Sequence, residues 1–465
     1  MSCRSSVRTS LASASAFYFR GKSKLPHILK RTRLWYSATP VQQGIWVLDT
    51  DERLRPTYLI PSVLEFAGRV NHQILVDAVR HVVSRHPALR SRFRLNTATG
   101  EVEYRTDGEP GHVGLIDARA EGWTGEKLDH LVEVLCWTPF DLAHEAQVRA
   151  EVIHVDEHRT LLVLTMHHIS FDGWSRNLLV PEIVTVYRAL LAGEQPTLAA
   201  AVHPADVPST VRQERSPERV AQVLERLRGA PMTVDLPYDR PPPAAEPESI
   251  VAENLSITLD HELSARVLAT SGQEGCTPFM MAVVVLTGTL CRMTGQRDFL
   301  IAFGWPGRDD PATSEAIGMY MATLMLRVTF DHDTTWRDLL RITRRSAMAA
   351  FVDSDVPLDA IAAALNPGRR QIWPPLTPIL VNVDDLPSNI ELTPTVSGHY
   401  WPMRSVYGKY DLDLFVRVDR DAGGDRITFA LDFLVELFDP ATIESILGKL
   451  RQSAAELAHS SEVKL

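Results

Sequence analysis

The feature that most constrains the fold is a mainly apolar segment at positions 161–169, in which Leu161–Leu164 are all apolar. It follows a partly alternating segment, 146–155, and a short polar turn, so the two segments are predicted to form a β-hairpin. The second strand of this hairpin is expected to be buried on both faces. Helical spacing begins after Trp174, and one face of that helix carries Leu179, Ile183, Val186 and Leu190. A short loop, 170–173, therefore joins a core strand to a helix, a place where polar groups can line a cleft.

The second half of the chain also alternates between strands and helices. The patterns predict helices at 278–293, 336–351 and 442–457. They predict strands at 298–303 and 379–383, and a hairpin of 410–418 with 426–434. The predicted fold class is therefore α/β, as a mixed-sheet α+β sandwich.

A chain of 465 residues exceeds the usual size of one domain, so two lobes are expected. The predicted N-terminal lobe spans 36–205 and the C-terminal lobe spans 249–465. Between them, 206–248 is predicted to be a linker, with a helix-like piece at 217–228. Closely spaced prolines at 241–247 exclude regular structure and favour an extended bridge.

The segment 1–35 differs from the rest of the chain because it is basic, and no acidic residue precedes Asp49. Its cations are Arg4, Arg8, Arg20, Lys22, Lys24, Lys30, Arg31 and Arg33. Such a composition is similar to that of organelle transit peptides. We interpret it instead as a disordered tail or an upstream-extended start.

Charge and cysteine usage exclude several classes of protein. The formal net charge of −10 disfavours nucleic acid as a partner. The cysteines Cys3, Cys136, Cys276 and Cys291 form no C-x-x-C pair, which indicates a reduced, cytoplasmic protein without a metal site. The apolar runs are too short to span a membrane, so no membrane partner is expected.

The strongest functional signal is a pair of histidines, His167 and His168, followed by Asp172 and Gly173. Adjacent residues on a strand point to opposite faces, so one histidine can face a cleft while the other packs inward. Histidine is suited to accept or position a proton near neutral pH. The Asp172 carboxylate can stabilise the loop by pairing with an arginine. Gly173 permits close backbone approach and can present its N–H to a developing oxyanion.

Two other interpretations of this motif remain at this point. The histidines could be ordinary core residues, or His168 and Asp172 could hold a metal ion. A metal is disfavoured because no third ligand stands nearby in the sequence. The motif by itself thus indicates an acyltransferase.

The chain resembles the condensation domains of nonribosomal peptide synthetases, which belong to the chloramphenicol-acetyltransferase-like superfamily. The similarity begins near Tyr36 and runs to the C-terminus in the order of the family's motifs. The catalytic third motif of the family matches 166–175, including His167, His168, Asp172 and Gly173. The other matching segments are 39–46, 85–93, 236–242, 304–308, 317–323, 355–358 and 407–412.

The resemblance implies two chloramphenicol-acetyltransferase-like lobes in a V shape, with a tunnel between them that holds His168. A donor acyl group would enter on the phosphopantetheine arm of an acyl or peptidyl carrier protein, and no bound cofactor is expected. A small-molecule amine or alcohol would enter from the other side. By this analogy His168 either deprotonates or orients the acceptor, and His167 braces the loop.

Further site residues follow from the same matched motifs. Asp172 is predicted to form a structural salt bridge with Arg90 or Arg308. The residues predicted to contact substrate are Trp174, Ser175, Tyr320 and Gly304. Two positions depart from the family pattern: Ala322 stands where an asparagine is usual, and Asp353 where a histidine is common. A different acceptor is one implication of these departures.

The predicted function is that of a free-standing condensation enzyme, an acyltransferase that forms an amide or ester in natural-product biosynthesis. Because no adenylation or carrier domain follows, we expect the substrates to be met in trans. One alternative is an O- or N-acyltransferase that uses acyl-CoA or a polyketide carrier. Another is a non-catalytic docking platform, which the intact His168, Asp172 and Gly173 disfavour. Epimerisation is disfavoured by the intact segment 85–93 and by the ending of the third motif, Asp172–Ser175.

Overall fold

The computed structural model describes residues 35–207, 217–243, 249–365, 376–384, 386–387, 389–401, 405–421, 423–459 and 461–465. The predicted basic tail, 1–35, lies outside these residues except for Trp35. Parts of the predicted linker, 208–216 and 244–248, also lie outside them. Residues 36–465 belong to one structural unit, which contains all the elements described below.

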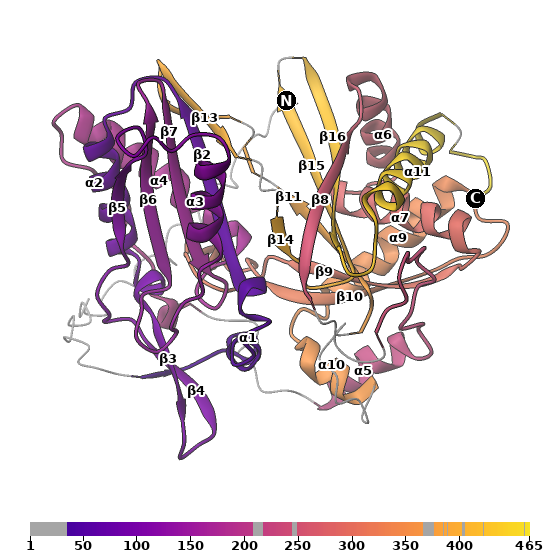
Figure 1. Ribbon diagram of the computed structural model, residues 1–465. Coiled ribbons are helices and arrows are strands. Elements are labelled where there is room, and N and C mark those ends of the chain that lie inside the picture. The colour runs from indigo at the N-terminus through magenta and orange to yellow at the C-terminus, as the bar shows by residue number, and fades with distance from the viewer. Residues whose placement is uncertain are drawn as a thin grey trace, which may run out of the picture. The chain divides into compact units, whose positions relative to one another are not determined.

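A six-stranded sheet is built around the predicted hairpin, which is confirmed as β6 (Val148–Asp156) and β7 (Arg159–His167) (Figure 1). Its strand order is β12-β13-β2-β7-β6-β5. The other strands are β2 (Leu59–Ala67), β5 (Val113–Asp117), β12 (Ile390–Thr393) and β13 (Val396–Tyr400). All residues of β7 after Arg159 are buried, as expected for a strand covered on both faces.

Helices cover both faces of this sheet. Leu162, Leu164 and Met166 pack with α2 (His72–Arg85) and α4 (Gly173–Leu191). The alternate residues Leu161 and Val163 pack with α3 (Glu126–Trp137). The period of two along β7 therefore divides its side chains between two cores.

Two strands from late in the chain complete the six-stranded sheet. β13 pairs antiparallel with β2, and β12 pairs with β13. Arg188 of α4 adds to this join, since its side chain donates to the backbone carbonyls of Glu391 and Leu392. Residues within the predicted C-terminal lobe thus extend the sheet that is formed by the first half of the chain.

A seven-stranded sheet forms the second half, in the order β10-β9-β11-β15-β16-β8-β14. Its strands are β8 (Val251–Thr258), β9 (Asp298–Trp305), β10 (Ala322–Thr329), β11 (Ile379–Asp384), β14 (Ser405–Tyr407), β15 (Leu412–Asp421) and β16 (Gly424–Leu434). β11 runs parallel to β9 and β15, and the other pairings are antiparallel. Both sheets are therefore mixed.

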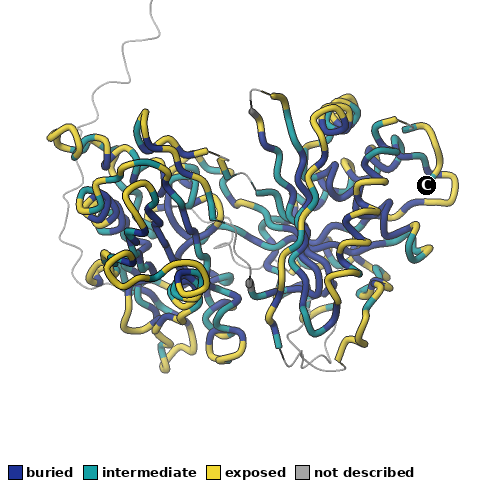
Figure 2. Tube along the Cα trace, turned by 45° about the horizontal axis from the view of Figure 1, so that its top comes forward, coloured by how far each residue is buried: buried dark blue, intermediate teal, exposed yellow. Residues whose placement is uncertain are grey.

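The main core of the second half lies between this sheet and four helices (Figures 1 and 2). These helices are α6 (His261–Gln273), α7 (Pro278–Thr294), α9 (Trp336–Phe351) and α11 (Pro440–His459). The bounds of α9 match the predicted 336–351, and α7 and α11 extend at most two residues beyond their predicted ends. Each of these predictions rested on local apolar spacing, which the packed faces confirm.

Smaller elements make up most of the remaining regular structure in the described residues. A three-stranded sheet contains β1 (Tyr36–Ser37), β4 (Glu101–Arg105) and β3 (Arg92–Asn96). The remaining α-helices are α1 (Pro40–Asp49), α5 (Pro217–Leu227), α8 (Pro311–Ser314) and α10 (Leu358–Leu365). Among the described residues no single helix is long and apolar enough to cross a membrane. The α6–α7 pair reaches that length only with a bend of 103°, and α7 is a core helix.

Candidate active site

The loop between β7 and α4 is held at both ends. The strand ends at His167, although the backbone N–H of His168 still donates to the Tyr58 carbonyl at 2.7 Å. The helix begins at Gly173, whereas its start was predicted after Trp174. Asp172 is its N-cap, and its carboxylate accepts from the Ser175 backbone N–H at 2.9 Å. This cap, which the sequence analysis did not predict, explains the earlier start of the helix.

Asp172 is also the centre of a buried ion pair. Both of its oxygens accept from Nη2 of Arg308, at 2.7 and 2.8 Å. The side chains are almost fully buried, with exposures of 1% for Asp172 and 4% for Arg308. The carboxylate further accepts from the Ser175 hydroxyl and from the Tyr320 backbone N–H. Asp172 therefore ties the start of α4 to a loop that is distant in the sequence.

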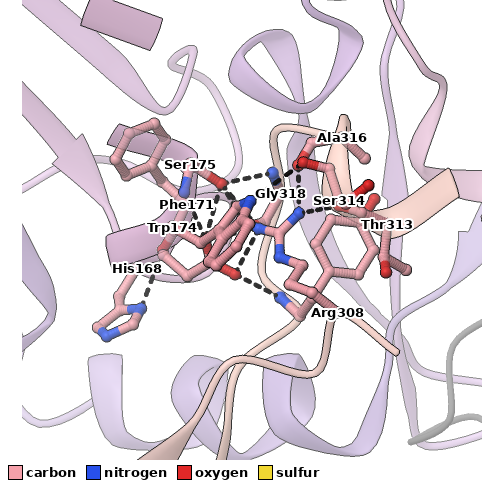
Figure 3. A network of polar contacts seen from close by, with 11 residues as sticks. His168, Phe171, Trp174, Ser175, Arg308, Thr313, Ser314, Ala316 and Gly318 are labelled. Carbon is pink, nitrogen blue, oxygen red and sulfur yellow. Dashed lines mark hydrogen bonds and ion pairs between the residues drawn. The ribbon is translucent and has the colours of Figure 1, made fainter. Parts of the chain in front are cut away.

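Arg308 completes this network on its other side. Its Nη1 donates to the backbone carbonyls of Thr313 and Ala316 (Figure 3). The Tyr320 ring lies under the guanidinium, with 4.5 Å from the Arg308 carbon to the ring centroid. Of the two predicted partners for Asp172, Arg308 is therefore the correct one. The alternative, Arg90, is wrong, because it lies at the end of a separate 3-10 turn (Pro87–Arg90) and is not bonded to Asp172.

The hydrogen bond of His168 determines which ring nitrogen is basic. Its Nδ1 lies 2.9 Å from the carbonyl oxygen of Phe171 (Figure 3). A carbonyl can only accept, so Nδ1 carries the proton in the neutral ring and Nε2 has a lone pair. The residue is 9% exposed. Burial, followed by the charge of Lys409, lowers the pKa of His168 well below its usual range. The neutral, base-competent form is therefore favoured.

His167 has the opposite arrangement. Its Nδ1 accepts from the backbone N–H of Ile169 at 3.1 Å, so its Nε2 carries the proton. That nitrogen lies 3.3 Å from Oδ1 of Asp49, the last residue of α1. The ring is fully buried. Both nitrogens of His167 are thus engaged within the protein, which fits the predicted bracing role.

Of the next three predicted site residues, Gly173 and Trp174 are exposed and Ser175 is buried. Gly173 is exposed, and a Cβ placed there would meet no atom within 4 Å, so the space beside it is open. Trp174 is 38% exposed, and its Nε1 donates to the Ser314 carbonyl at 3.0 Å. Ser175 is fully buried and bonded to Asp172 and Gly318. It therefore belongs to the Asp172–Arg308 network and does not face a substrate.

Gly304 and Tyr320 lie on the second half of the chain. The Gly304 N–H, in β9, donates to Oδ1 of Asn382 at 3.2 Å. Tyr320 belongs to the Asp172–Arg308 network, because its backbone N–H donates to Asp172 and its ring packs against Arg308. The predicted substrate contacts of these two residues remain proposals. A cavity of about 20 Å³ borders Ser170 and Tyr320, which is room for about one water molecule.

Gly307 allows the Arg308 loop to approach Tyr320. Its φ is +64°, and a Cβ there would lie 2.0 Å from the Tyr320 carbonyl oxygen. We expect Gly307→Ala to lower the free energy of unfolding by about 2–4 kcal/mol, because it adds left-handed strain to a steric clash. Denaturant unfolding measures this loss. Gly44→Ala, in α1 where a Cβ meets no atom within 4 Å, is the control and should be neutral or stabilising. Equal stability of the Gly307 variant and the wild type would contradict the prediction.

Segment 85–93, matched to the second motif, serves the fold of the first half. Arg85 and His86, at the end of α2, both contact the Glu182 carboxylate of α4, at 2.6 and 2.7 Å. Asp353, one of the two departures from the family pattern, pairs with Arg219 and Arg226. Ala322, the other departure, is the buried first residue of β10.

One charged residue near His168 was not predicted. Lys409 Nζ lies 4.9 Å from the ring centroid of Tyr58, whose carbonyl binds the His168 N–H. Its segment, 407–412, was matched to the family without any role for the lysine. A lysine between apolar and aromatic neighbours just before a core strand was the available signal. Among the described residues, no group of three or more His, Cys, Asp or Glu side chains is arranged to hold a metal ion.

Comparison with known proteins agrees with the motif-based resemblance. A family model described as "Condensation domain" matches residues 33–465. Malpinin synthetase from Mortierella alpina is 29% identical over 88% of this chain and 5% of its own length. Phosphinothricin tripeptide synthetase PhsC from Streptomyces viridochromogenes is 28% identical over 90% of this chain and 38% of its own length. The chain thus spans well under half the length of these relatives.

Solved structures share the fold. The X-domain from teicoplanin biosynthesis is 24% identical, with a TM-score of 0.77 over 93% of this chain and 97% of that chain. The first condensation domain of the calcium-dependent antibiotic synthetase, in complex with a substrate analogue, is 19% identical. Its TM-score is 0.76 over 93% of this chain and 98% of that chain. The predicted mixed-sheet, chloramphenicol-acetyltransferase-like fold is therefore confirmed. On the family match and the fold together, the chain belongs to the condensation domain family, whose members catalyse amide-bond formation in nonribosomal peptide synthesis.

Proposed function

We propose that this chain transfers an acyl or aminoacyl group from the phosphopantetheine thioester of a carrier protein to an amine or hydroxyl acceptor. The observation that carries the proposal is the His168 ring, whose Nδ1–H is committed to the Phe171 carbonyl so that Nε2 is the basic atom. Asp172 and Arg308 hold the loop that presents this ring. We retain the V-shaped pair of lobes and the tunnel as part of the same proposal.

The chemical step follows from that geometry. The acceptor nitrogen or oxygen attacks the thioester carbonyl carbon, and the new C–N or C–O bond forms as the carbonyl becomes an oxyanion. Nε2 of His168 takes the acceptor proton or orients the acceptor for attack. The C–S bond then breaks, and the proton passes to the leaving thiolate. The products are the condensed acyl chain and the free pantetheine thiol.

Gly173 is suited to stabilise the oxyanion. It is the first residue of α4, so its N–H has no acceptor within the helix. The positive end of the helix dipole also lies at this position and favours a negative charge there. The open space beside Gly173 leaves room for a reacting carbonyl group. We propose that this N–H binds the carbonyl oxygen as negative charge develops there.

The partners follow from this chemistry. We propose a carrier protein that docks in trans and a small-molecule or carrier-bound acceptor, with the protein itself holding no cofactor. The described cysteines Cys136, Cys276 and Cys291 are free thiols, which supports a reducing, cytoplasmic location.

Intact-mass spectrometry of an acyl-loaded carrier protein, incubated with the enzyme and a panel of amines and alcohols, tests the function. We expect loss of the acyl group from the carrier, matched by a condensed product whose mass gives the bond type. The condensed product should be absent with His168→Ala. The matched control is His158→Ala, at the exposed β6–β7 turn, which should behave as wild type.

Other outcomes identify the alternatives. Transfer from acyl-CoA but from no carrier would assign the protein to the acyltransferase branch of the superfamily. Carrier binding without any transfer would indicate a docking platform. The docking alternative has a precedent. An X-domain from teicoplanin biosynthesis that shares this fold has been solved in complex with another protein, OxyB.

A further inference from the structure

Lys409 reaches from the second half of the chain to Tyr58, the residue before β2 whose carbonyl binds the backbone of His168. It follows β14 and precedes β15, and its neighbour Gly408 is fixed by donating to the Ile250 carbonyl at 3.0 Å. Its Nζ lies over the Tyr58 ring, 4.9 Å from the centroid. The Tyr58 ring centroid is 6.5 Å from that of His168, and the Tyr58 carbonyl accepts from the His168 N–H. The ammonium and the imidazole therefore share one aromatic neighbour.

The Lys409 ammonium is only weakly neutralised. Among the described residues, no oxygen lies within hydrogen-bond or ion-pair distance of its Nζ, so the Tyr58 face is its one close electrostatic contact. Burial lowers the pKa of Lys409 to about 8, while Asp413 opposes this shift. A group with that pKa is still mostly charged at neutral pH. A positive charge thus remains next to the active-site loop.

Asp413, the carboxylate that acts on Lys409, is a poor counterion for this charge. Asp413 of β15 is 6% exposed, and its Oδ1 has no hydrogen-bond partner within the described part of the chain. Asp432 stands directly opposite it in the β15–β16 ladder. Burial and the charge of Asp432 raise the pKa of Asp413 well above its usual range. A carboxyl group that resists ionisation offsets little of the lysine charge.

We propose that Lys409 is a positioning residue for condensation, which keeps the His168 ring uncharged by holding an ammonium over the Tyr58 ring. The inference deepens the proposed function and rests on it, because it assigns the protonation state on which the base at Nε2 depends. A positive charge nearby disfavours a second one on the imidazole. The ring thereby stays unprotonated below the pH at which a free histidine would take up a proton.

Other titratable groups also surround His168. His167 adds a smaller repulsion, and it is itself held by Asp49 from α1 and influenced by Arg149 from β6. Tyr58 is partly buried, and this burial raises the pKa of its hydroxyl, so the hydroxyl stays neutral. Burial therefore lowers the pKa of His168 the most, and among the charged groups Lys409 has the largest effect.

Titration of the His168 ring by NMR in the full-length protein, labelled with ¹³C-histidine, tests the inference without any substrate. The His168 signal is assigned by its loss in His168→Gln. In the wild type we expect a titration midpoint below about 6.5. In Lys409→Met the midpoint should rise by on the order of one pH unit. Lys409→Arg should restore the wild-type value, because it keeps the charge.

The pH dependence of turnover separates this role from direct substrate contact. The acid limb of the rate profile should move to higher pH in Lys409→Met, while the rate near pH 8, where His168 is neutral in either protein, should stay within about threefold. If Lys409→Met unfolds, Lys409→Gln replaces it. An unchanged His168 midpoint, or an equal loss of rate at every pH, would overturn the inference. Since the NMR result needs no turnover, it stands apart from any failure of the proposed function.

Discussion

His168→Gln is expected to lower the turnover number by about 10²–10⁴-fold, the usual contribution of a positioned general base. Glutamine fills a similar volume but has no nitrogen that takes up a proton near neutral pH. The Nδ1–H of His168 is committed to Phe171, so only Nε2 can act on the acceptor. Steady-state kinetics with a loaded carrier protein measures the loss.

The unfolding transition of this variant provides the control. Since His168 retains some exposure and bonds to the fold through a single ring nitrogen, its replacement should change the free energy of unfolding far less than the rate. His158→Ala should leave both quantities unchanged. Turnover of the His168 variant within a few-fold of wild type would rule out His168 as the base.

Asp172→Ala is expected to lower the free energy of unfolding by about 3–5 kcal/mol, the usual cost of leaving one partner of a buried ion pair alone. Arg308 would remain almost fully buried with its charge uncompensated. The start of α4 would also lose its N-cap, which adds about 1 kcal/mol. Urea unfolding followed by circular dichroism measures the difference.

A double-mutant cycle identifies the cause of this loss. Arg308→Met in the Asp172→Ala background removes the stranded charge, so the double variant should be more stable than Asp172→Ala alone. Methionine also fills much of the space of the arginine stem. Arg308→Met alone completes the cycle. If the losses of the two single variants simply added in the double variant, or if Asp172→Ala unfolded at the same urea concentration as the wild type, the buried pair would not have the structural role assigned here.

Local patterns in the sequence predicted most individual elements. The β6–β7 hairpin and helix α9 were predicted because their apolar spacing of two or about 3.6 residues is a local property. The match to the family's third motif then identified His168 and Asp172 as members of one site. Helix boundaries were less accurate where a cap decides them, as at Asp172, whose side chain serves the helix and the ion pair together.

Contacts between distant parts of the chain could not be read in the same way. Nothing local in 390–400 indicates that β12 and β13 join the sheet of the first half. The choice of Arg308 over Arg90 likewise depends on which loop meets α4 in space. Lys409 was missed because its neighbour Tyr58 lies in the other half of the chain. Such pairings depend on tertiary structure, which one sequence does not specify by period or spacing.

The pairing of β13 with β2 has a consequence for synthesis on the ribosome. β2 emerges early, but the strand that covers its edge is translated only after most of the chain has been made. At about 5–20 residues per second this leaves the edge of β2 unpaired for tens of seconds. An uncovered strand edge is a template for pairing with other chains. The nascent protein is therefore open to pairing with other chains during its synthesis, a risk that the stability of the finished fold does not reveal.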